Sequence, residues 1–552
     1  MPSFSVEGGV DDVHARPEAA LGPASCQKES WKAREHVTVE TQEGPLRGEL
    51  LGTYTGNPMF RFLGIPYAEP PVGDLRFQPP VKKAAWSEVR DALSMASHCP
   101  QRKSGSPSGD EDCLYLNVYG PGTPSQNATK KAVMVWIHGG CFTEGSGESA
   151  KPNYFVDNDV IVVSINYRLG LLGFLSTGDG VVPGNMGLKD QAEALRWVQR
   201  NINVFGGDPD KVTIFGQSAG GASVHYHVLS SSSKGLFKNA IAMSGSALNP
   251  WAFSKNATDR AIRYAKTLGY TGQSSNDLVD FLTNVEFGSL LSDETIALSD
   301  EDSKSLFTCV WVPSAEPEHE SAFLTEDPWT LVAEGRFTHV PYMSGVTDLE
   351  QLAQVMSHGV LSSESRVRNL DENFDEIVGC DLRLPTRKER LDGALSVKQF
   401  YYNGSEITVK ENYTTALFDS HLFFVEGVDA VIRSTARYSS EPVFYYEFSF
   451  NGPLSSFPGG MGAAHADDIH YLFATSTLDP DSDGGIVRAQ MTAMWTNFAK
   501  YDNPTPEGNS LLTEVWNEYD ESSPTYLEIT SPLKTAKSLF GTDMNFWHDL
   551  LP

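Results

Sequence analysis

The sequence around Ser218 constrains the fold more than any other stretch. Residues 212–215 form a short apolar run typical of a buried strand, and they lead into the pattern Gly-x-Ser-x-Gly at residues 216–220. Residues 222–229 then have a helix-like pattern. A strand, a sharp turn and a helix in this order lift one serine above a sheet, and glycines two positions away avoid collisions with the neighbouring strand or helix. We therefore predict that Ser218 is a nucleophile whose neighbour, Ala219, directs its amide N–H into the same space.

Strand-length apolar runs recur along the chain and alternate with helical segments. The predicted strands cover residues 45–51, 60–67, 114–119, 132–137, 160–165, 211–215, 240–243 and 443–450. Helical spacing predicts helices over residues 190–202 and 486–501. Several strands are apolar throughout, which indicates an α/β fold with a large, mostly parallel sheet and helices on both faces. The more polar, helical segments 250–335 and 350–440 are predicted to be cap insertions that form one wall of a cleft.

Composition and charge limit the organisation of the chain and its partners. Hydrophobic residues make up 40% of the 552 residues, which is sufficient for one large domain over residues 36–552. Residues 1–35 are polar and contain prolines, so we expect a tail that contributes little to the core. The formal charge of −29 repels phosphate backbones, which argues against nucleic acid as a partner. No run of eighteen apolar residues occurs in the sequence, so no membrane span is expected.

A nucleophilic serine needs a base and a carboxylate that orients the base. His465 is the predicted base, because small residues precede it and leave room for its ring above the sheet. Behind such an elbow, the acid lies between the serine and the histidine along the chain. Asp348 and Glu350 both follow an apolar run at residues 339–343, and their spacing alone does not distinguish them.

The donors for an oxyanion are predicted on a second loop. Residues 138–142, His-Gly-Gly-Cys-Phe, follow an apolar run and are too rich in glycine for ordinary packing. The amide N–H groups of Gly140, Cys141 and Ala219 are predicted to point at the developing negative charge. Removal of one such donor typically costs about 3–4 kcal/mol of transition-state stabilisation. These pieces, in the required order along the chain, predict a serine hydrolase.

Five longer segments carry a family resemblance. They are RFLGIPYAEPPVGDLRFQPP (residues 61–80), EDCLYLNVY (111–119), GNMGLKDQAEALRWVQRNI (184–202), FGQSAG (215–220) and GAAHADDIHYLF (462–473). With them the chain resembles the type B carboxylesterase family, which includes cholinesterases and insect esterases, from about Glu40 to its C-terminus. The resemblance implies an α/β-hydrolase fold and the hydrolysis of small neutral esters through an acyl-enzyme, without a cofactor.

The resemblance also assigns roles to single residues. The family places its acid five residues after the glycine that follows the core strand, which selects Glu350 over Asp348. The family closes the loop between Cys99 and Cys113 with a disulfide, so the same pair is predicted here. The predicted catalytic residues are therefore Ser218, Glu350 and His465.

Three residues depart from the family pattern. Cys141 stands where Gly or Ala is usual, so the oxyanion loop keeps its amide donor and gains a thiol, which we interpret as an inert small side chain. Gln217 stands where cholinesterases have an acid, and Gln351 replaces the glycine that commonly follows the acid. None of these changes removes a member of the triad, so they bear on rate and substrate range.

The same resemblance narrows the substrate. The loop at residues 100–112 has no aromatic residue, whereas cholinesterases bind choline against a tryptophan in this loop. The elbow with residues 190–191 resembles juvenile hormone esterases, and residues 224–227 and 248–251 resemble insect detoxifying or odorant-degrading esterases. Trp251 would then line the acyl pocket and favour short acyl groups. We predict an insect-type hydrolase of detoxification, odorant, pheromone or hormone esters.

Other functions fit the same residues. A slow-turnover protein would be acylated quickly and deacylated slowly, and would sequester reactive esters such as organophosphates. A non-catalytic adhesion member of the fold would not be acylated at all. His465, Asp467, Asp468 and His470 resemble a metal cluster, but this strand and loop do not supply the ligand geometry of a zinc site, so no metal is predicted.

The sequence gives two opposed indications of compartment. Residues 1–35 lack a basic start followed by an apolar core, which favours the cytoplasm, and this is the compartment we expect. The alternative is secretion, which is favoured by the cysteine pair and by the sequons at Asn127, Asn256, Asn403 and Asn412.

Overall fold

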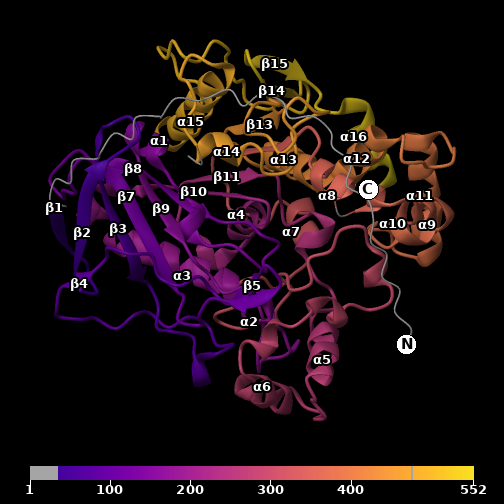
Figure 1. The fold of residues 1–552 in the computed structure, drawn as a ribbon, viewed down its shortest axis with the longest axis horizontal. Helices are drawn as coiled ribbons and strands as arrows, with labels where there is room; N and C mark the ends of the chain where they lie inside the picture. Colours follow the sequence, from indigo (N-terminus) through magenta and orange to yellow (C-terminus); the bar gives the residue numbers. More distant parts are fainter. Residues whose placement is uncertain (1–34, 358, 474–475, 552) are drawn as a thin grey trace, which may run out of the picture. The chain divides into compact units, whose positions relative to one another are not determined.

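A large mixed sheet forms the centre of the fold. The computed structural model describes residues 35–551 except 358, 474 and 475, and thirteen strands of this part form the sheet. Their order is β1-β2-β3-β7-β9-β8-β10-β11-β12-β13-β14-β15, with β4 beside β2 (Figure 1). Neighbouring strands from β9 to β14 are parallel. The strands at both ends pair antiparallel, except that β4 is parallel to β2. The parallel centre agrees with the predicted α/β class.

In the described part of the chain eight of the fifteen strands coincide with the predicted runs, and the other seven were not among the predicted strands. The fifteen strands are β1 (Glu35–Glu40), β2 (Pro45–Gly52), β3 (Pro58–Pro66), β4 (Arg90–Asp91), β5 (Gln101–Lys103), β6 (Ser106–Ser108), β7 (Tyr115–Pro121), β8 (Lys131–Ile137), β9 (Ile161–Ile165), β10 (Gly207–Gln217), β11 (Asn239–Met243), β12 (Tyr342–Thr347), β13 (Val443–Phe448), β14 (Thr525–Ile529) and β15 (Lys534–Lys537). Strands β5 and β6 form a separate hairpin. Strand β10 is longer than predicted at both ends and continues up to the residue before Ser218.

The helices lie between the strands and in the two predicted insertions. They are α1 (Asn153–Asp157), α2 (Gly170–Phe174), α3 (Met186–Asn201), α4 (Ala219–Leu229), α5 (Ala257–Thr267), α6 (Ser275–Asn284), α7 (Pro328–Ala333), α8 (Leu352–Ser357), α9 (Glu364–Glu372), α10 (Phe374–Gly379), α11 (Arg387–Tyr402), α12 (Asn412–Ser420), α13 (Glu426–Tyr438), α14 (Ile469–Leu472), α15 (Asp483–Tyr501) and α16 (Gly541–Leu550). A π-helical turn, η10 (His421–Val425), joins α12 to α13.

Both faces of the sheet are buried, which explains the uninterrupted apolar strands. Side chains alternate along a strand, so Val133 and Val135 of β8 belong to one core cluster, whereas Met134 and Trp136 belong to another. The first cluster includes side chains of α3, α4 and α13, and the second includes side chains of α1, α14 and α15. Helices on both faces were predicted, and the structure confirms them.

The two insertions meet around a cavity. The first contains α5, α6 and α7, and the second contains α8 to α13 (Figure 1). A cavity of about 580 Å³ is lined by residues of both insertions, among them Trp251, Cys309 and Arg383. The predicted cap insertions therefore do form walls of a cavity.

Two further predictions concern the N-terminal tail and membrane-spanning helices. The expected tail over residues 1–35 lies outside the described residues, apart from Glu35, where β1 begins. In the part of the chain that the structure describes, every helix is too short or too polar to cross a membrane.

Candidate active site

Ser218 lies at a strained turn between β10 and α4. Its backbone has φ +61° and ψ −126°, a conformation that residues with a side chain rarely adopt, and it is partly exposed while both its neighbours are buried. A Cβ on Gly216 would lie 2.6 Å from the carbonyl oxygen of Ile137, and one on Gly220 would lie 2.1 Å from it. The two glycines of the motif are therefore required by the close approach of β8, as the sequence predicted.

His465 and Glu350 lie together beyond the same edge of the sheet. His465 Nδ1 is 2.6 Å from Glu350 Oε2, and the other carboxylate oxygen accepts a hydrogen bond of 2.8 Å from the amide N–H of Thr347. Glu350 is 1% exposed, and the His465 side chain is 25% exposed. Because β10, β12 and β13 belong to the parallel centre of one sheet, the loops after them emerge at a common edge, which brings residues far apart in the sequence together.

Asp348 has a different position from Glu350. Its Oδ1 accepts a hydrogen bond of 2.7 Å from the amide N–H of Ala463, and the amide N–H of Leu349 donates to the carbonyl oxygen of Ala463. The amide N–H of His465 in turn donates to the carbonyl oxygen of Glu350. Glu350 thus contacts the imidazole, and Asp348 holds the loop that carries it. Burial raises the pKa of Asp348 to about 7.

The predicted oxyanion loop packs against the elbow. A Cβ on Gly139 would lie 2.5 Å from the carbonyl oxygen of Gln217 and 2.9 Å from Ser218 Cβ. Gly140, Cys141 and the residue after them all have positive φ, of 103°, 55° and 59°. The loop therefore begins close to Ser218, and Cys141 and Phe142 adopt a backbone conformation that their Cβ atoms disfavour.

Gln101 holds the C-terminal end of this loop by two hydrogen bonds to Gly145. The sequence did not indicate this role. Its side-chain amide donates to the carbonyl oxygen of Gly145 and accepts from the Gly145 amide N–H, at 2.9 Å in each case. Gln101 lies within the loop that the disulfide between Cys99 and Cys113 closes, with Cα atoms 4.9 Å apart. The disulfide predicted from the family resemblance is present, and it connects with the candidate site through Gln101.

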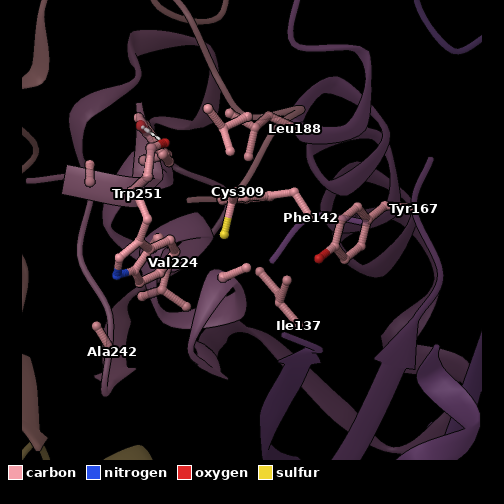
Figure 2. Close-up of a cluster of buried hydrophobic side chains, with 14 of the residues drawn as sticks. Ile137, Phe142, Tyr167, Leu188, Val224, Ala242, Trp251 and Cys309 are labelled. Carbon is pink, nitrogen blue, oxygen red and sulfur yellow. Dashed lines mark hydrogen bonds between the residues drawn. The ribbon is translucent and has the colours of Figure 1, made fainter. Parts of the chain in front are cut away.

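Cys141 is not the free thiol that the sequence analysis expected. Its sulfur forms a disulfide with Cys309, with Cα atoms 5.5 Å apart and a sequence separation of 168. Cys309 lies in the same buried cluster as Phe142 and Trp251, which Figure 2 draws around it. The interpretation as an inert small side chain is therefore wrong. A separation this large leaves no pattern in the sequence by which the pair could be found.

Gln217 and Phe424 also contact the His465 ring. The Gln217 amide nitrogen lies 3.1 Å from His465 Nε2 and 3.4 Å from Nδ1, so it is directed between the two nitrogens. The rings of Phe424 and His465 have centroids 4.6 Å apart. Phe424 belongs to the π-helical turn η10, a feature that is often found at functional sites. Among the described residues no hydrogen bond joins Ser218 Oγ to His465, a contact that often tightens only when substrate binds.

Trp251 is separated from His465 by one aromatic ring. It is 3% exposed, its indole N–H donates to the carbonyl oxygen of Phe423, and its ring centroid lies 5.5 Å from that of Phe424. It also lines the cavity between the insertions, together with Cys309.

The other polar residues near the elbow and the histidine have structural partners. His225 and His227 are buried on α4, and burial lowers the pKa of each to about 3. Asp467 accepts hydrogen bonds from the amide N–H groups of Ala464 and Ser456. In the sequence Asp467 resembled part of a metal cluster, and in the structure it holds the loop around His465.

Asp468 provides a pH-dependent prediction. Burial, and then the nearby charge of Glu350, raise its pKa from 3.8 to about 7. A carboxyl with a raised pKa stays protonated in the folded protein while the unfolded chain ionises, so its contribution to stability is lost as the pH rises from about 4 to 7. The Asp468→Asn variant has no carboxyl at this position, so it does not lose this stability as the pH rises. We expect its free energy of unfolding, relative to that of the wild type, to increase by up to about 3 kcal/mol between pH 5 and pH 8, since one pH unit of pKa shift corresponds to about 1.4 kcal/mol.

Urea unfolding at the two pH values measures this difference directly. Asp502→Asn is the control, because Asp502 is partly exposed and ion-paired with Lys238. A difference between Asp468→Asn and wild type that is equal at both pH values would show that Asp468 ionises normally in the folded protein.

Comparison with known proteins agrees with this geometry. Residues 35–547 match the model of the carboxylesterase family. The chain is 34% identical to a carboxylic ester hydrolase of Bombus ignitus, over 94% of this chain and 95% of that protein. It is 33% identical to juvenile hormone esterase of Tribolium castaneum (93% and 94%) and 33% identical to bile salt-activated lipase of Mus musculus (96% and 89%). With this match extending over nearly all of the sheet and both insertions, the chain belongs to the carboxylesterase family and is a carboxylic ester hydrolase with the α/β-hydrolase fold.

Proposed function

We propose that the chain hydrolyses esters through an acyl-enzyme on Ser218, with His465 as the general base and Glu350 as the residue that orients it. The observation that carries this proposal is the 2.6 Å contact between His465 and the buried Glu350 at the edge of the sheet where the strained Ser218 lies. A carboxylate can only accept a hydrogen bond, so it holds the proton on Nδ1 and leaves Nε2 as an acceptor. The Gln217 amide contacts this acceptor at 3.1 Å in the structure, and Ser218 Oγ would contact it in the reaction.

The reaction then follows from these positions. Ser218 Oγ turns toward His465 Nε2, loses its proton to it and attacks the carbonyl carbon of the ester. Glu350 stabilises the imidazolium that forms, and the imidazolium returns the proton to the leaving alcohol oxygen as its bond to carbon breaks. Water attacks the acyl-enzyme by the same steps and restores Ser218. The amide N–H groups of Gly140, Cys141 and Ala219 bind the negative oxygen of each tetrahedral intermediate.

Covalent labelling combined with turnover tests this function. The protein is incubated with a fluorophosphonate, and the tryptic peptide that contains Ser218 is examined by mass spectrometry. We expect phosphonylation of Ser218 and, in unlabelled protein, steady release of p-nitrophenol from p-nitrophenyl acetate and butyrate. One equivalent of p-nitrophenol followed by silence would identify a sequestering protein. The absence of both labelling and release would support the adhesion alternative.

The substrates we propose are small neutral esters of the kind that insect esterases hydrolyse. The relatives include a juvenile hormone esterase and a protein named venom carboxylesterase-6 of Apis mellifera. The hairpin of β5 and β6 occupies the loop where cholinesterases carry their choline-binding tryptophan, and it has no aromatic residue. This favours hormone, odorant or xenobiotic esters over choline esters.

Trp251 is proposed to limit the acyl group. Because its ring packs on Phe424, which in turn contacts His465, the Trp251→Leu variant should open space toward the neighbouring cavity. We expect the ratio of kcat/KM for p-nitrophenyl hexanoate to that for the acetate to rise about 3- to 30-fold, the range typical of one or two methylene groups in an apolar pocket. Trp329→Leu is the matched control, because Trp329 lines the same cavity but packs under Arg383. Equal ratios in the two variants would remove Trp251 from the acyl pocket.

For the compartment we depart from the sequence-based expectation. Two disulfides favour an oxidising environment, because cytoplasmic proteins rarely keep them. Three of the four sequon asparagines are exposed, namely Asn127, Asn256 and Asn403, and Asn412 is half-buried. We therefore propose secretion, the alternative to the cytoplasm, and mass spectrometry of the natural protein before and after glycosidase treatment tests it.

A further inference from the structure

The centre of the oxyanion loop is held by a covalent bond to the first insertion. We propose that the disulfide between Cys141 and Cys309 positions the Cys141 amide N–H for catalysis, so that these two cysteines are positioning residues of the reaction. This inference rests on the proposed function, since it concerns the oxyanion that Ser218 would generate. It departs from the family pattern, in which Gly or Ala stands at the position of Cys141.

The backbone at Cys141 needs an external constraint. Gly140 at φ 103° adopts its conformation without strain, because it has no Cβ. Cys141 at φ 55° and Phe142 at φ 59° are in the left-handed region, where a Cβ approaches the following carbonyl oxygen. A chain with side chains at two consecutive such positions returns to an extended or right-handed conformation unless its surroundings prevent this. Such a return would rotate the peptide N–H of Cys141 away from Ser218.

Hydrogen bonds hold the loop on both sides of Cys141, including the peptide that carries its N–H. The amide N–H groups of Thr143 and Glu144 donate to the carbonyl oxygen of Gly140, and the amide N–H of Gly170 donates to the carbonyl oxygen of Phe142. The bonds to Gly140 orient the peptide plane between Gly140 and Cys141, and the bond to Phe142 fixes the turn that follows. The disulfide adds a restraint on Cys141 itself, through its Cβ, against the strain at its φ.

Cys309 is a fixed anchor for this bond. It is 2% exposed, and its neighbours are tied to other elements: the carbonyl oxygen of Val310 accepts from Arg260 of α5, and the carbonyl oxygen of Pro313 accepts from the amide N–H of Ser254. In Figure 2 the Cys309 sulfur lies within the cluster that contains Phe142 and Trp251. The disulfide thus connects a strained loop to a rigid buried segment.

The test compares two double variants that both lack the disulfide. In Cys141→Ala/Cys309→Ala, alanine keeps the strain at φ 55°, and nothing covalent opposes it. In Cys141→Gly/Cys309→Ala, glycine adopts the same φ without strain, so the loop can form unaided. Wild type, both double variants and Ser218→Ala are assayed with p-nitrophenyl acetate. For the three proteins that keep Ser218, kcat is expressed per serine titrated with a fluorophosphonate, so molecules that fail to fold do not enter the value. The rate of Ser218→Ala is expressed per mole of protein.

We expect the alanine pair to lose about 10- to 100-fold in kcat with KM changed less than about 3-fold, because a misplaced oxyanion donor affects the transition state more than substrate binding. The glycine pair should stay within about 3-fold of wild type. Affinity for an aryl trifluoromethyl ketone, whose adduct with serine carries the same oxyanion, should fall with kcat across the variants. A merely structural disulfide would lower the melting temperature of both pairs alike and leave kcat and this affinity unchanged.

Three results would overturn the inference. The inference fails when peptide mapping of unreduced wild type finds Cys141 and Cys309 unlinked, when both pairs keep the wild-type kcat, or when both lose it equally while ketone affinity stays constant. Failure of the proposed function gives a different result, namely esterase activity that survives in Ser218→Ala. In that case the oxyanion is not formed at this loop, and the positioning role is excluded together with the nucleophile.

Discussion

Replacing Ser218 with alanine is expected to lower kcat for p-nitrophenyl acetate by about 10⁵- to 10⁶-fold. Alanine keeps the backbone of the elbow and removes only the oxygen that would form the acyl bond, so the remaining rate comes from binding and the oxyanion donors alone. The loss is expected to reside in kcat, because the substrate still fits. Steady-state kinetics measure this loss in kcat. The substrate concentration is varied from tenfold below to tenfold above KM, and the enzyme concentration is high enough to detect the remaining activity.

Ser223 of α4 provides the matched control for this substitution. Its hydroxyl donates to the carbonyl oxygen of Ala219 and lies one helical turn beyond the elbow, so Ser223→Ala removes a buried hydroxyl from the same region. We expect less than about a fivefold loss of kcat in this variant. A Ser218→Ala enzyme that retains more than about 1% of the wild-type rate would show that another group carries the acyl chemistry.

Glu350→Gln should reduce kcat by about 10³- to 10⁴-fold. The amide keeps the shape of the side chain but offers no negative charge to the imidazolium, and it can donate to Nδ1 and so place the histidine proton on the wrong nitrogen. Asp348→Asn keeps an oxygen that can accept from the Ala463 amide N–H, so we expect less than about a tenfold loss.

Kinetics of the two variants side by side separate the two carboxylates. They are two positions apart in the sequence, and both lie in the loop after β12, so a general disturbance of this loop would affect them equally. A reversed order, with Asp348→Asn the more damaged enzyme, would move the role of the acid to Asp348. Melting temperatures of both variants show whether either loss reflects unfolding.

Local patterns in the sequence were sufficient to predict most strands of the central sheet and the turn at Ser218. The apolar runs of β8, β9, β10 and β13 could be recognised because strands buried on both faces carry few polar residues. Ser218 could be singled out because its turn demands glycines at fixed distances. Glu350 and Asp348 were equivalent by spacing, and only the family resemblance chose between them.

The contacts between distant segments were beyond the reach of these patterns. The partner of Cys141 lies in an insertion of irregular structure, and cysteine spacing carries no information at that separation. Gln101 is an ordinary polar residue until the fold places it beside Gly145. Phe424 has the appearance of a core residue, and only the π-helical turn directs its ring toward His465. Each of these depends on how the insertions and loops pack, and hydrophobic periodicity does not encode that packing.

The residues of the candidate site are synthesised at different times, and the base joins the site only when β13 pairs with β12. The elbow and the oxyanion loop follow β10 and β8, whereas the acid and the base follow β12 and β13, whose register joins Tyr342 to Val443. A ribosome has therefore produced more than four fifths of the chain before His465 emerges. Until that last part of the sheet docks, the nascent chain holds Ser218 without His465, and under the proposed mechanism it therefore lacks its general base.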